Sequence, residues 1–347
     1  MRTSLREISA VSKNCKHVFG PVPARRLGRS LGVDLVPFKT CSYDCIYCQL
    51  GRTTCKTVER KEWVPMDAVL DELKQKVSSR PDYITLSGSG EPTLHSRLGE
   101  IIEHIQAMSD VPVAVLTNGS LLWQKEVREE VALADVVLPS LDAPDPERFE
   151  FINRPHPDIT FERLLDGLAA LRREFSGKYW LEVMLLGGYT SVPVQVRELA
   201  GWVRRIRPDK VQLNTAVRPP AEEYAMAVPP ERLAELARMF EPRAEVVAEH
   251  HGQRAAGESK ASAEAILALV RRRPCTVEDI AHGLGLNPSE TVKSLGGLER
   301  RGKVIGERHG LEQFYRAAAS TRGARSSPGQ TRSKPILRIV AAKAAKP

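Results

Sequence analysis

The stretch Cys41-Ser42-Tyr43-Asp44-Cys45-Ile46-Tyr47-Cys48 decides how the rest of this chain is interpreted. Its three cysteines are spaced C-x3-C-x2-C and follow directly after an apolar run at 31–38 that is typical of a strand. Thiolates spaced this closely can reach one small inorganic centre from a single loop. A structural zinc site is closed by four ligands, and an ordinary iron–sulfur cluster takes four cysteines. Three cysteines therefore indicate a centre with one metal position open to something that is not protein.

This cysteine pattern resembles that of the radical S-adenosylmethionine (SAM) superfamily. In that family three cysteines bind a 4Fe–4S cluster and SAM chelates the fourth iron, so the resemblance implies Cys41, Cys45 and Cys48 as metal ligands. It also implies that Tyr47, the aromatic residue before the last cysteine, lies beside the adenine of SAM. From the residues alone, the alternative is a zinc knuckle completed by a distant histidine, such as His17 or His95.

The segment after residue 30 alternates between two kinds of pattern. Apolar runs of strand length are separated by segments with helical spacing, such as Val69, Leu70 and Leu73. Buried strands that alternate with amphipathic helices predict βα units and a parallel sheet. Because an eight-unit barrel takes roughly 250 residues, six units should take about 190, which fits residues 31–218. The sequence predicts an α/β partial (βα)6 TIM-type barrel, the fold that the resemblance also implies, with strands at 31–38, 83–87, 113–117, 136–141, 180–186 and 210–214.

Composition divides the chain into five parts. We expect a lead-in loop at 1–30, because two prolines and two glycines fall between residues 19 and 30. The barrel should occupy 31–249, followed by a polar, glycine-punctuated linker at 250–261. A small module is expected at 262–316, and a basic, disordered tail at 317–347.

The pattern at 262–316 is that of a winged helix-turn-helix. A helix is expected at 263–272, a second after the capping residue Thr276, and a third that begins at Pro288 after Asn287 and ends before Gly302. A two-stranded wing should follow at 303–315. The third helix is nearly neutral, which predicts weak nucleic-acid contact or a docking unit rather than sequence-specific DNA binding; its charged residues are Glu290, Lys293, Glu299, Arg300 and Arg301.

In barrels of this kind the chemistry lies at the carboxyl ends of the strands. The second strand ends in Ser87-Gly88-Ser89-Gly90-Glu91-Pro92. This resembles the family's Gly-Gly-Glu-type motif, which implies that Ser89, Gly90 and Glu91 meet the amino group of SAM. Ser89 and Gly90 depart from that motif because they stand where it has paired glycines. Without the resemblance, a plain glycine-rich turn is the alternative.

Four further polar residues lie at the ends of the later strands. Asn118 lies at the end of the third, Ser140 and Asp142 at the end of the fourth, and Asn214 at the end of the sixth. Their hydroxyl, amide and carboxylate groups suit the ribose or the carboxylate of SAM, which the family commonly binds at these strand ends. For Asn118 the alternative is that it only stabilises a turn.

The head of the chain, from Gly20-Pro-Val-Pro-Ala-Arg-Arg to the Thr54 that follows the cysteines, adds a narrower resemblance. It is similar to an iron–sulfur oxidoreductase group within the superfamily that is itself distantly similar to wybutosine-type radical enzymes. This resemblance implies no particular substrate, so an RNA or a peptide both stay open.

Charge and cysteine usage indicate a cytoplasmic protein. Residues 317–347 carry seven basic residues and no acid, and without them 44 of the 51 basic residues remain against 43 acidic ones. Seven of the eight net positive charges thus belong to the tail, and residues 1–316 carry a net charge of +1. No apolar leader opens the sequence and no run approaches 18 apolar residues, so neither a signal peptide nor a membrane contact is expected. Six cysteines, three of them clustered, suggest a reducing compartment.

These observations predict a radical SAM enzyme. By the resemblance, a reducing partner such as flavodoxin or ferredoxin supplies an electron to the cluster. SAM is then cleaved to a 5′-deoxyadenosyl radical that abstracts hydrogen from an unidentified substrate. The alternative is an iron–sulfur regulator that senses redox state and binds DNA through the C-terminal module. A sensor needs the cysteines but not the polar strand ends, and these favour the enzyme.

Overall fold

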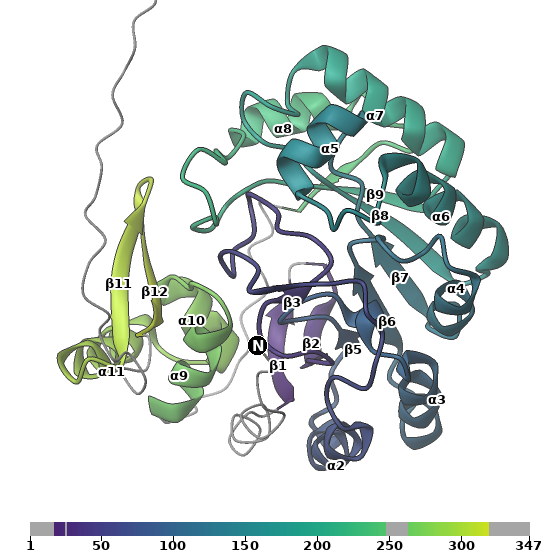
Figure 1. The fold of residues 1–347 in the computed structure, drawn as a ribbon. Coiled ribbons are helices and arrows are strands. Elements are labelled where there is room, and N and C mark those ends of the chain that lie inside the picture. The colour runs from purple at the N-terminus through teal and green to yellow at the C-terminus, as the bar shows by residue number, and fades with distance from the viewer. Residues whose placement is uncertain (1–16, 25, 248–262, 319–347) are drawn as a thin grey trace, which may run out of the picture. The chain divides into compact units, whose positions relative to one another are not determined.

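The computed structural model describes residues 17–24, 26–247 and 263–318. Its centre is an eight-stranded sheet with the strand order β1-β2-β5-β6-β7-β8-β9-β10 (Figure 1). The strands are β1 (Val18–Ala24), β2 (Gly28–Val33), β5 (Tyr83–Leu86), β6 (Val113–Thr117), β7 (Val136–Pro139), β8 (Lys178–Met184), β9 (Lys210–Asn214) and β10 (Glu245–Val246).

All neighbours in this sheet are parallel except β1 and β2, which are antiparallel. The register places Leu31 beside Ile84 and Ile84 beside Val113, three residues whose side chains are fully buried. Within the described residues β1 and β10 are not paired with each other, so the sheet stays open. The prediction of an α/β fold with a parallel sheet is confirmed: the six expected strands are β2 and β5 to β9, and β10 adds one more parallel strand.

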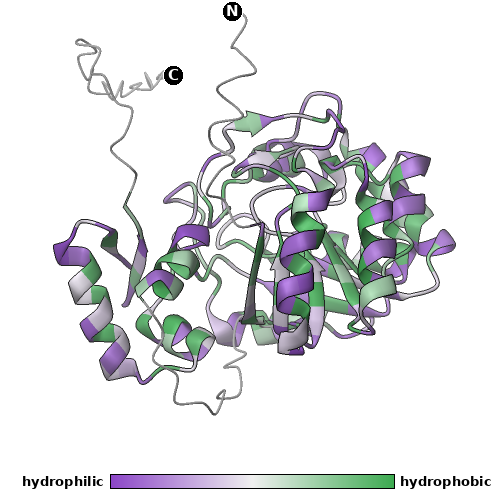
Figure 2. Cartoon of the chain, turned by 90° about the horizontal axis from the view of Figure 1, so that it is seen from below, coloured by the Kyte–Doolittle hydropathy of each residue, from purple (hydrophilic) through white to green (hydrophobic). Residues whose placement is uncertain are grey.

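Helices follow the strands and lie along the outer side of the sheet (Figure 1). Each has an apolar and a polar side, which the colouring by hydropathy makes visible (Figure 2). Val69, Leu70 and Leu73, whose spacing predicted a helix, are buried residues of α2, and helices also separate the later strands. The bounds are α2 (Met66–Lys76), α3 (Leu98–Met108), α4 (Lys125–Val131), α5 (Pro146–Asn153), α6 (Phe161–Glu174), α7 (Pro193–Ile206) and α8 (Pro230–Ala237).

The lead-in expected as a loop at 1–30 contains a strand instead, where the structure describes it. β1 runs antiparallel to β2, from Val18 opposite Val33 to Ala24 opposite Gly28. Prolines 21 and 23 argued for a loop, because proline cannot donate to a ladder. An edge strand tolerates them, since one side of its backbone needs no partner in the sheet. A register shift between Phe19 and Val22 accommodates the first of the two.

Residues 263–317 form three helices and a two-stranded sheet: α9 (Ala263–Arg272), α10 (Val277–Leu284), α11 (Pro288–Arg300), β11 (Val304–His309) and β12 (Glu312–Ala317). The expected caps are present. Thr276 and Asp279 form a reciprocal capping box, and Asn287 caps α11 through the amide of Ser289. Ile266, Leu295 and Phe314 are among the buried side chains here. The predicted linker at 250–261, and all of the predicted tail beyond residue 318, lie outside the described residues.

Candidate functional site

The three clustered cysteines lie on a loop that follows β2 and is held at both ends. Two short parallel strands, β3 (Thr40–Cys41) and β4 (Cys55–Lys56), pair to close its base. Inside the loop the amide of Cys48 donates to the carbonyl of Cys45 at 3.1 Å, and that of Gly51 to Cys48 at 3.0 Å. These short turns bring the thiols to one side of a cavity that Cys41, Cys45 and Cys48 all line.

Each of the three thiols faces one side-chain nitrogen that can donate a hydrogen bond to it. Asn118 Nδ2 lies 3.6 Å from the sulfur of Cys41, and Asn153 Nδ2 lies 3.5 Å from that of Cys45. Lys39 Nζ lies 3.3 Å from the sulfur of Cys48. N–H donors stabilise a thiolate rather than a thiol. Hydrogen bonds to cysteine sulfurs also help to set the reduction potential of iron–sulfur clusters. The donor set therefore fits three thiolate ligands of a cluster.

Burial disfavours the ionised thiolates of Cys41 and Cys45 unless a cation is bound nearby. It raises the pKa of Cys41 to about 12, with the negative charge of Glu91 as the next cause. It also raises the pKa of Cys45 well above the ordinary value, helped by the neighbouring cysteines. Metal binding requires deprotonated thiols, so the positive charge of a metal centre has to offset this burial. The loop, whose three cysteines are half-buried, thus suits a metal cluster better than free thiols.

His95 does not serve the zinc alternative. Its side chain is buried, with Nε2 2.9 Å from the carbonyl of Val64 and Nδ1 accepting from the amide of Arg97 at 3.2 Å. Both ring nitrogens are therefore engaged in holding local backbone. Among the described residues, no three His, Cys, Asp or Glu side chains converge on a position for a single metal ion.

The turn after β5 comes close to the backbone of the cysteine loop. A side chain at position 90 would overlap the carbonyl oxygen of Thr40, so only glycine fits there. Gly88 has φ +110°, and a side chain at this position would meet the carboxylate of Asp34. Ser89 lies between them, donates its amide to Asp34 at 2.8 Å and accepts the amide of Lys39 at 2.7 Å. Serine therefore stands only at position 89, and glycine is kept at positions 88 and 90, where this turn requires it.

Glu91 points away from the cavity and into the protein. Its carboxylate accepts the hydroxyl of Thr117 at 2.6 Å and the amide of Asn118 at 2.7 Å, and it also accepts the amide and hydroxyl of Thr93. Burial raises the pKa of Glu91, while these hydrogen bonds act against the rise. The side chain ties the turn after β5 to the end of β6, and through Asn118 it supports a donor to Cys41.

The half-buried Tyr47 and the buried Asp142 form a second group beside the cysteines. The hydroxyl of Tyr47 donates to Asp142, which also accepts Asn153 Nδ2 at 3.0 Å and the amide of Met184 at 3.0 Å. Burial raises the pKa of Asp142 to about 6, against the effect of these donors. Asp142 therefore fixes the orientation of Tyr47 and of Asn153, the residue that faces the thiol of Cys45.

The cavity has a volume of about 420 Å³ and collects some of the predicted residues but not all. Those that line it, besides the cysteines, are Tyr47, Ser89, Gly90 and Asn214. Glu91, Asn118, Ser140 and Asp142 are not part of its lining. Asn118 and Asp142 instead contact residues that line the cavity, Cys41 and Tyr47 respectively. Ser140 forms a backbone bridge with Glu182.

Several lining residues were not predicted. Lys39, which is almost fully buried and has φ +62°, follows the first predicted strand and carried no motif that marks it in the sequence. Arg272 and Arg273 come from α9 and the residue after it, far along the chain. Arg26 and Glu182, which form an ion pair, also line the cavity.

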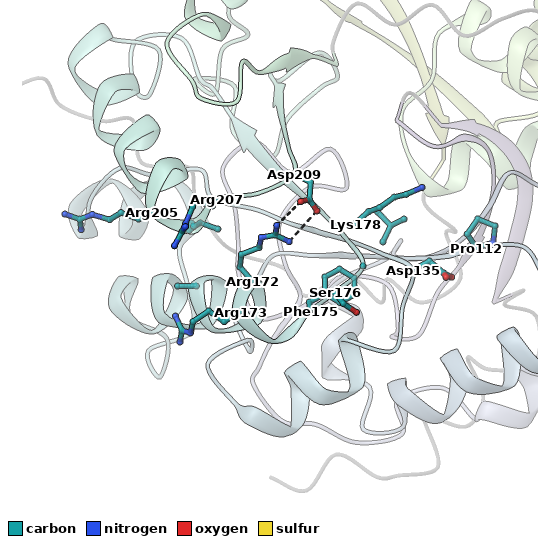
Figure 3. A pocket seen from close by; sticks show the side chains of 14 residues that line it. Pro112, Asp135, Arg172, Arg173, Phe175, Ser176, Lys178, Arg205, Arg207 and Asp209 are labelled. Atoms are coloured by element: carbon teal, nitrogen blue, oxygen red, sulfur yellow. Dashed lines mark hydrogen bonds and ion pairs between the residues drawn. The ribbon is translucent and has the colours of Figure 1, made fainter.

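A larger hollow of about 980 Å³ lies at the opposite, amino-terminal ends of β7, β8 and β9 (Figure 3). It is lined by arginines from α6 and α7 and by Lys178, and Arg172 pairs with Asp209 at 2.8 Å. The cysteines do not line this hollow. In open and closed (βα) barrels the chemistry belongs to the other end of the strands.

Comparison with known proteins shows which family the chain belongs to. The family model of the radical SAM superfamily matches residues 35–200. A UPF0026 protein of Helicobacter pylori (strain J99 / ATCC 700824) is 30% identical over 310 residues, which cover 87% of this chain and 98% of that protein. The chain belongs to the UPF0026 family. It carries a radical SAM domain, and the cofactors of that superfamily are a 4Fe–4S cluster and SAM.

Two other relatives are more similar but longer. A protein named GTPase Obg from Brachyspira hyodysenteriae is 39% identical over 294 residues, or 83% of this chain and 43% of that protein. A UPF0026 protein of Methanocaldococcus jannaschii is 38% identical over 210 residues, or 59% of this chain and 65% of that protein. The chain thus spans less than two thirds of the length of these two relatives. No described helix is long and apolar enough to cross a membrane.

Proposed function

We propose that this chain is a radical SAM enzyme that abstracts hydrogen from a substrate in the cavity beside Cys41, Cys45 and Cys48. One observation carries the proposal: three thiols, each facing its own side-chain donor, open into the same cavity as the turn at 87–90. When bound, the cluster and SAM supply the electron and the 5′-deoxyadenosyl radical for this chemistry.

The residues of the cavity take distinct roles in this proposal. Ser89 and Gly90 line the cavity and offer backbone groups to the ammonium of SAM, since glycine lets the chain approach closely. Tyr47, held by Asp142, provides an aromatic face for the adenine. Asn214 lines the cavity and offers an amide to the ribose or the carboxylate of SAM. Glu91 and Asn118 hold this arrangement in place rather than touching SAM.

We further propose that residues 262–316 are a winged helix-turn-helix that docks the substrate. Three helices followed by a two-stranded antiparallel sheet support this. α11 carries two basic residues, Lys293 and Arg300, and two acidic ones, Glu290 and Glu299. Its net charge is therefore too small to favour several phosphate contacts. The module then contacts nucleic acid weakly and without sequence preference. A flavodoxin or ferredoxin in the cytoplasm serves as the electron donor in this proposal.

The test is anaerobic reconstitution of the full chain with iron and sulfide, followed by dithionite and SAM. We expect a slow release of 5′-deoxyadenosine and methionine even without substrate, measured by liquid chromatography and mass spectrometry. The matched control is the Cys41→Ala variant, carried through the same reconstitution. A reduced protein with a full complement of iron that forms no 5′-deoxyadenosine would contradict the enzyme and favour the iron–sulfur regulator.

A further inference from the structure

The cavity beside the cysteines is lined partly by residues from the C-terminal module. Leu269, Arg272 and Arg273 line it together with Cys41 and Cys48. Arg272 forms an ion pair with Asp34, and its guanidinium lies 3.7 Å from the centre of the Phe19 ring. A molecule that occupies this cavity is therefore within reach of both the cysteine loop and the basic end of α9.

Arg218, which follows β9, is the most unusual lining residue because its charged group is buried. The residue is only 6% exposed. Its Nε donates to the carbonyl of Pro274 at 3.1 Å, and its Nη2 donates to Asp279 at 3.0 Å. Its Nη1 is also buried but has no hydrogen-bond partner among the described residues. A buried charged donor without an acceptor is costly, so this nitrogen points to a missing ligand atom.

Positive charge exceeds negative charge around this nitrogen. Arg218 and Arg273 both interact with the single carboxylate of Asp279. Burial lowers the pKa of Arg273, and the positive charge of nearby Arg218 lowers it further. The other lining arginines are neutralised, because Arg272 pairs with Asp34 and Arg26 with Glu182. The pair Arg218 and Arg273 is therefore left with an uncompensated positive charge at the wall of the cavity.

We infer that Arg218 and Arg273 form a subsite for an anionic oxygen group of the substrate, a phosphate or a carboxylate. The inference rests on the proposed function, since it assumes that the substrate enters the cysteine-lined cavity. Arginine suits both groups because its planar fork presents N–H donors to two oxygens of the same anion. The vacant Nη1 supplies such a donor, and the surplus charge favours an anion over a neutral group.

Two competing assignments of the anion site lead to different results. If the pair instead holds the carboxylate of SAM, its removal weakens SAM binding. If the basic hollow of Figure 3 is the true anion site, removal of Arg173 weakens anion binding and removal of Arg218 does not. Arg173 is exposed and lines that hollow, so it provides a matched control that also loses one positive charge.

The experiment titrates inorganic phosphate and, in parallel, acetate into the full chain at low salt, with binding followed by calorimetry. The variants are Arg218→Gln, Arg273→Gln and Arg173→Gln, and their folding is checked by denaturant unfolding. We expect the dissociation constant of the tighter-binding anion to rise about tenfold in each of the first two variants, because each loses one charge-assisted contact. Arg173→Gln should change it less than about twofold. Because Arg273→Gln leaves the bonds of Arg218 intact, it keeps the test decisive should Arg218→Gln fold poorly.

Absence of binding in the unmodified chain, or equal binding in all variants, would overturn the subsite. So would a loss confined to Arg173→Gln, or a weakening of SAM binding in Arg218→Gln with anion binding unchanged. Neither anion titration requires the cluster. The subsite can therefore fail while the reconstituted chain still releases 5′-deoxyadenosine, and the proposed function can fail while the subsite still binds phosphate or acetate.

Discussion

The two hollows at opposite ends of the parallel strands differ in a way that volume does not reveal. The hollow at the amino-terminal ends is the larger, about 980 Å³ against about 420 Å³ for the cysteine-lined cavity. Its central ion pair, Arg172 with Asp209, has side chains 29% and 42% exposed. In the cavity, Arg218 is buried with one donor unpartnered among the described residues, and two of the thiols have a raised pKa. A buried charged donor without a partner and two thiols with a raised pKa, rather than empty space, distinguish the cysteine-lined end of the strands.

The largest expected effect is the loss of iron binding when a cysteine of the cysteine-lined cavity is replaced. After anaerobic reconstitution we expect about four irons per chain. Replacement of any one of Cys41, Cys45 and Cys48 by alanine should abolish this binding, because these three thiolates are the only protein ligands that we propose for the cluster. Iron content and the visible absorption of the cluster measure the effect.

Two controls accompany this prediction. Cys275→Ala, in the buried core of residues 263–317, and Arg173→Gln, in the basic hollow, should both retain the full iron content. Stoichiometric zinc in place of iron in the unmodified chain would contradict the assignment of the cysteines.

The second prediction compares two glycines. Gly90→Ala places a methyl group against the carbonyl of Thr40 at the turn that lines the cavity, and we expect a loss of about 3 kcal/mol in the free energy of unfolding. Gly201 lies within α7, the helix whose Arg205 lines the basic hollow, and a methyl group there has an open surrounding. Gly201→Ala should therefore stabilise the protein by about 1 kcal/mol.

Urea unfolding of the two variants measures both free energies. If the two alanines had equal effects, the close approach of the turn to the cysteine loop would not be a constraint.

The features that could be predicted from the sequence are those that depend on local patterns. The apolar runs marked β5, β6 and β9 almost to the residue, because strands buried on both faces are continuously apolar. Thr276 and Asn287 marked the starts of α10 and α11, since a capping residue acts on amides only two or three positions away. The cysteine spacing predicted a metal site for the same reason, since its three proposed ligands share one short loop.

The partners that complete the site depend on contacts between distant parts of the chain. The donors to Cys41 and Cys45 are 77 and 108 residues away, and the arginine that meets Asp279 is 61 residues away. No spacing rule connects such pairs, so neither Asn153 nor Lys39 could be assigned to the site from the sequence. The role of Glu91 was also beyond reach, because whether a carboxylate faces the cavity or the core depends on Thr117 and Asn118.

The third prediction concerns the electrostatic effect of Lys39 on the reduction potential of a bound cluster. Its ammonium lies next to the sulfur of Cys48 and is almost fully buried, so its charge favours the reduced, more negative form of a bound cluster. Lys39→Met should make the reduction potential more negative by about 60 mV, the shift that corresponds to a tenfold change for one electron. Potentiometric titration followed by electron paramagnetic resonance measures it.

The matched control is Lys178→Met, which removes an exposed lysine from the basic hollow and should leave the potential unchanged. Equal shifts in the two variants would mean that Lys39 acts only through net charge, and that its contact with Cys48 has no special effect.

The smallest expected effect is on the free energy of unfolding, when Asp279 beside the cavity or Asp209 in the basic hollow is replaced by asparagine. Asp279→Asn should cost about 1 kcal/mol at neutral pH, because it leaves the buried Arg218 without its counter-charge. Asp209→Asn keeps an acceptor for the amide of Tyr179 and removes an ion pair between more exposed groups, so it should cost less, about 0.5 kcal/mol. Burial alone would raise the pKa of Asp279, but Arg218 and Arg273 outweigh burial and hold it below the ordinary value of 3.8.

A carboxyl group with a depressed pKa contributes stability above its unfolded pKa, and this contribution is lost as the pH falls through the folded value. The stability difference between the unmodified chain and Asp279→Asn should therefore be constant from pH 7 to about pH 5 and shrink below pH 4. Urea unfolding at a series of pH values measures this difference. The amide oxygen that the substitution introduces can still accept the amide of Thr276 in the capping box, so the capping bond should contribute little to it. A difference of the same size at pH 3 and pH 7 would assign the role of Asp279 to the helix cap and not to the arginine pair.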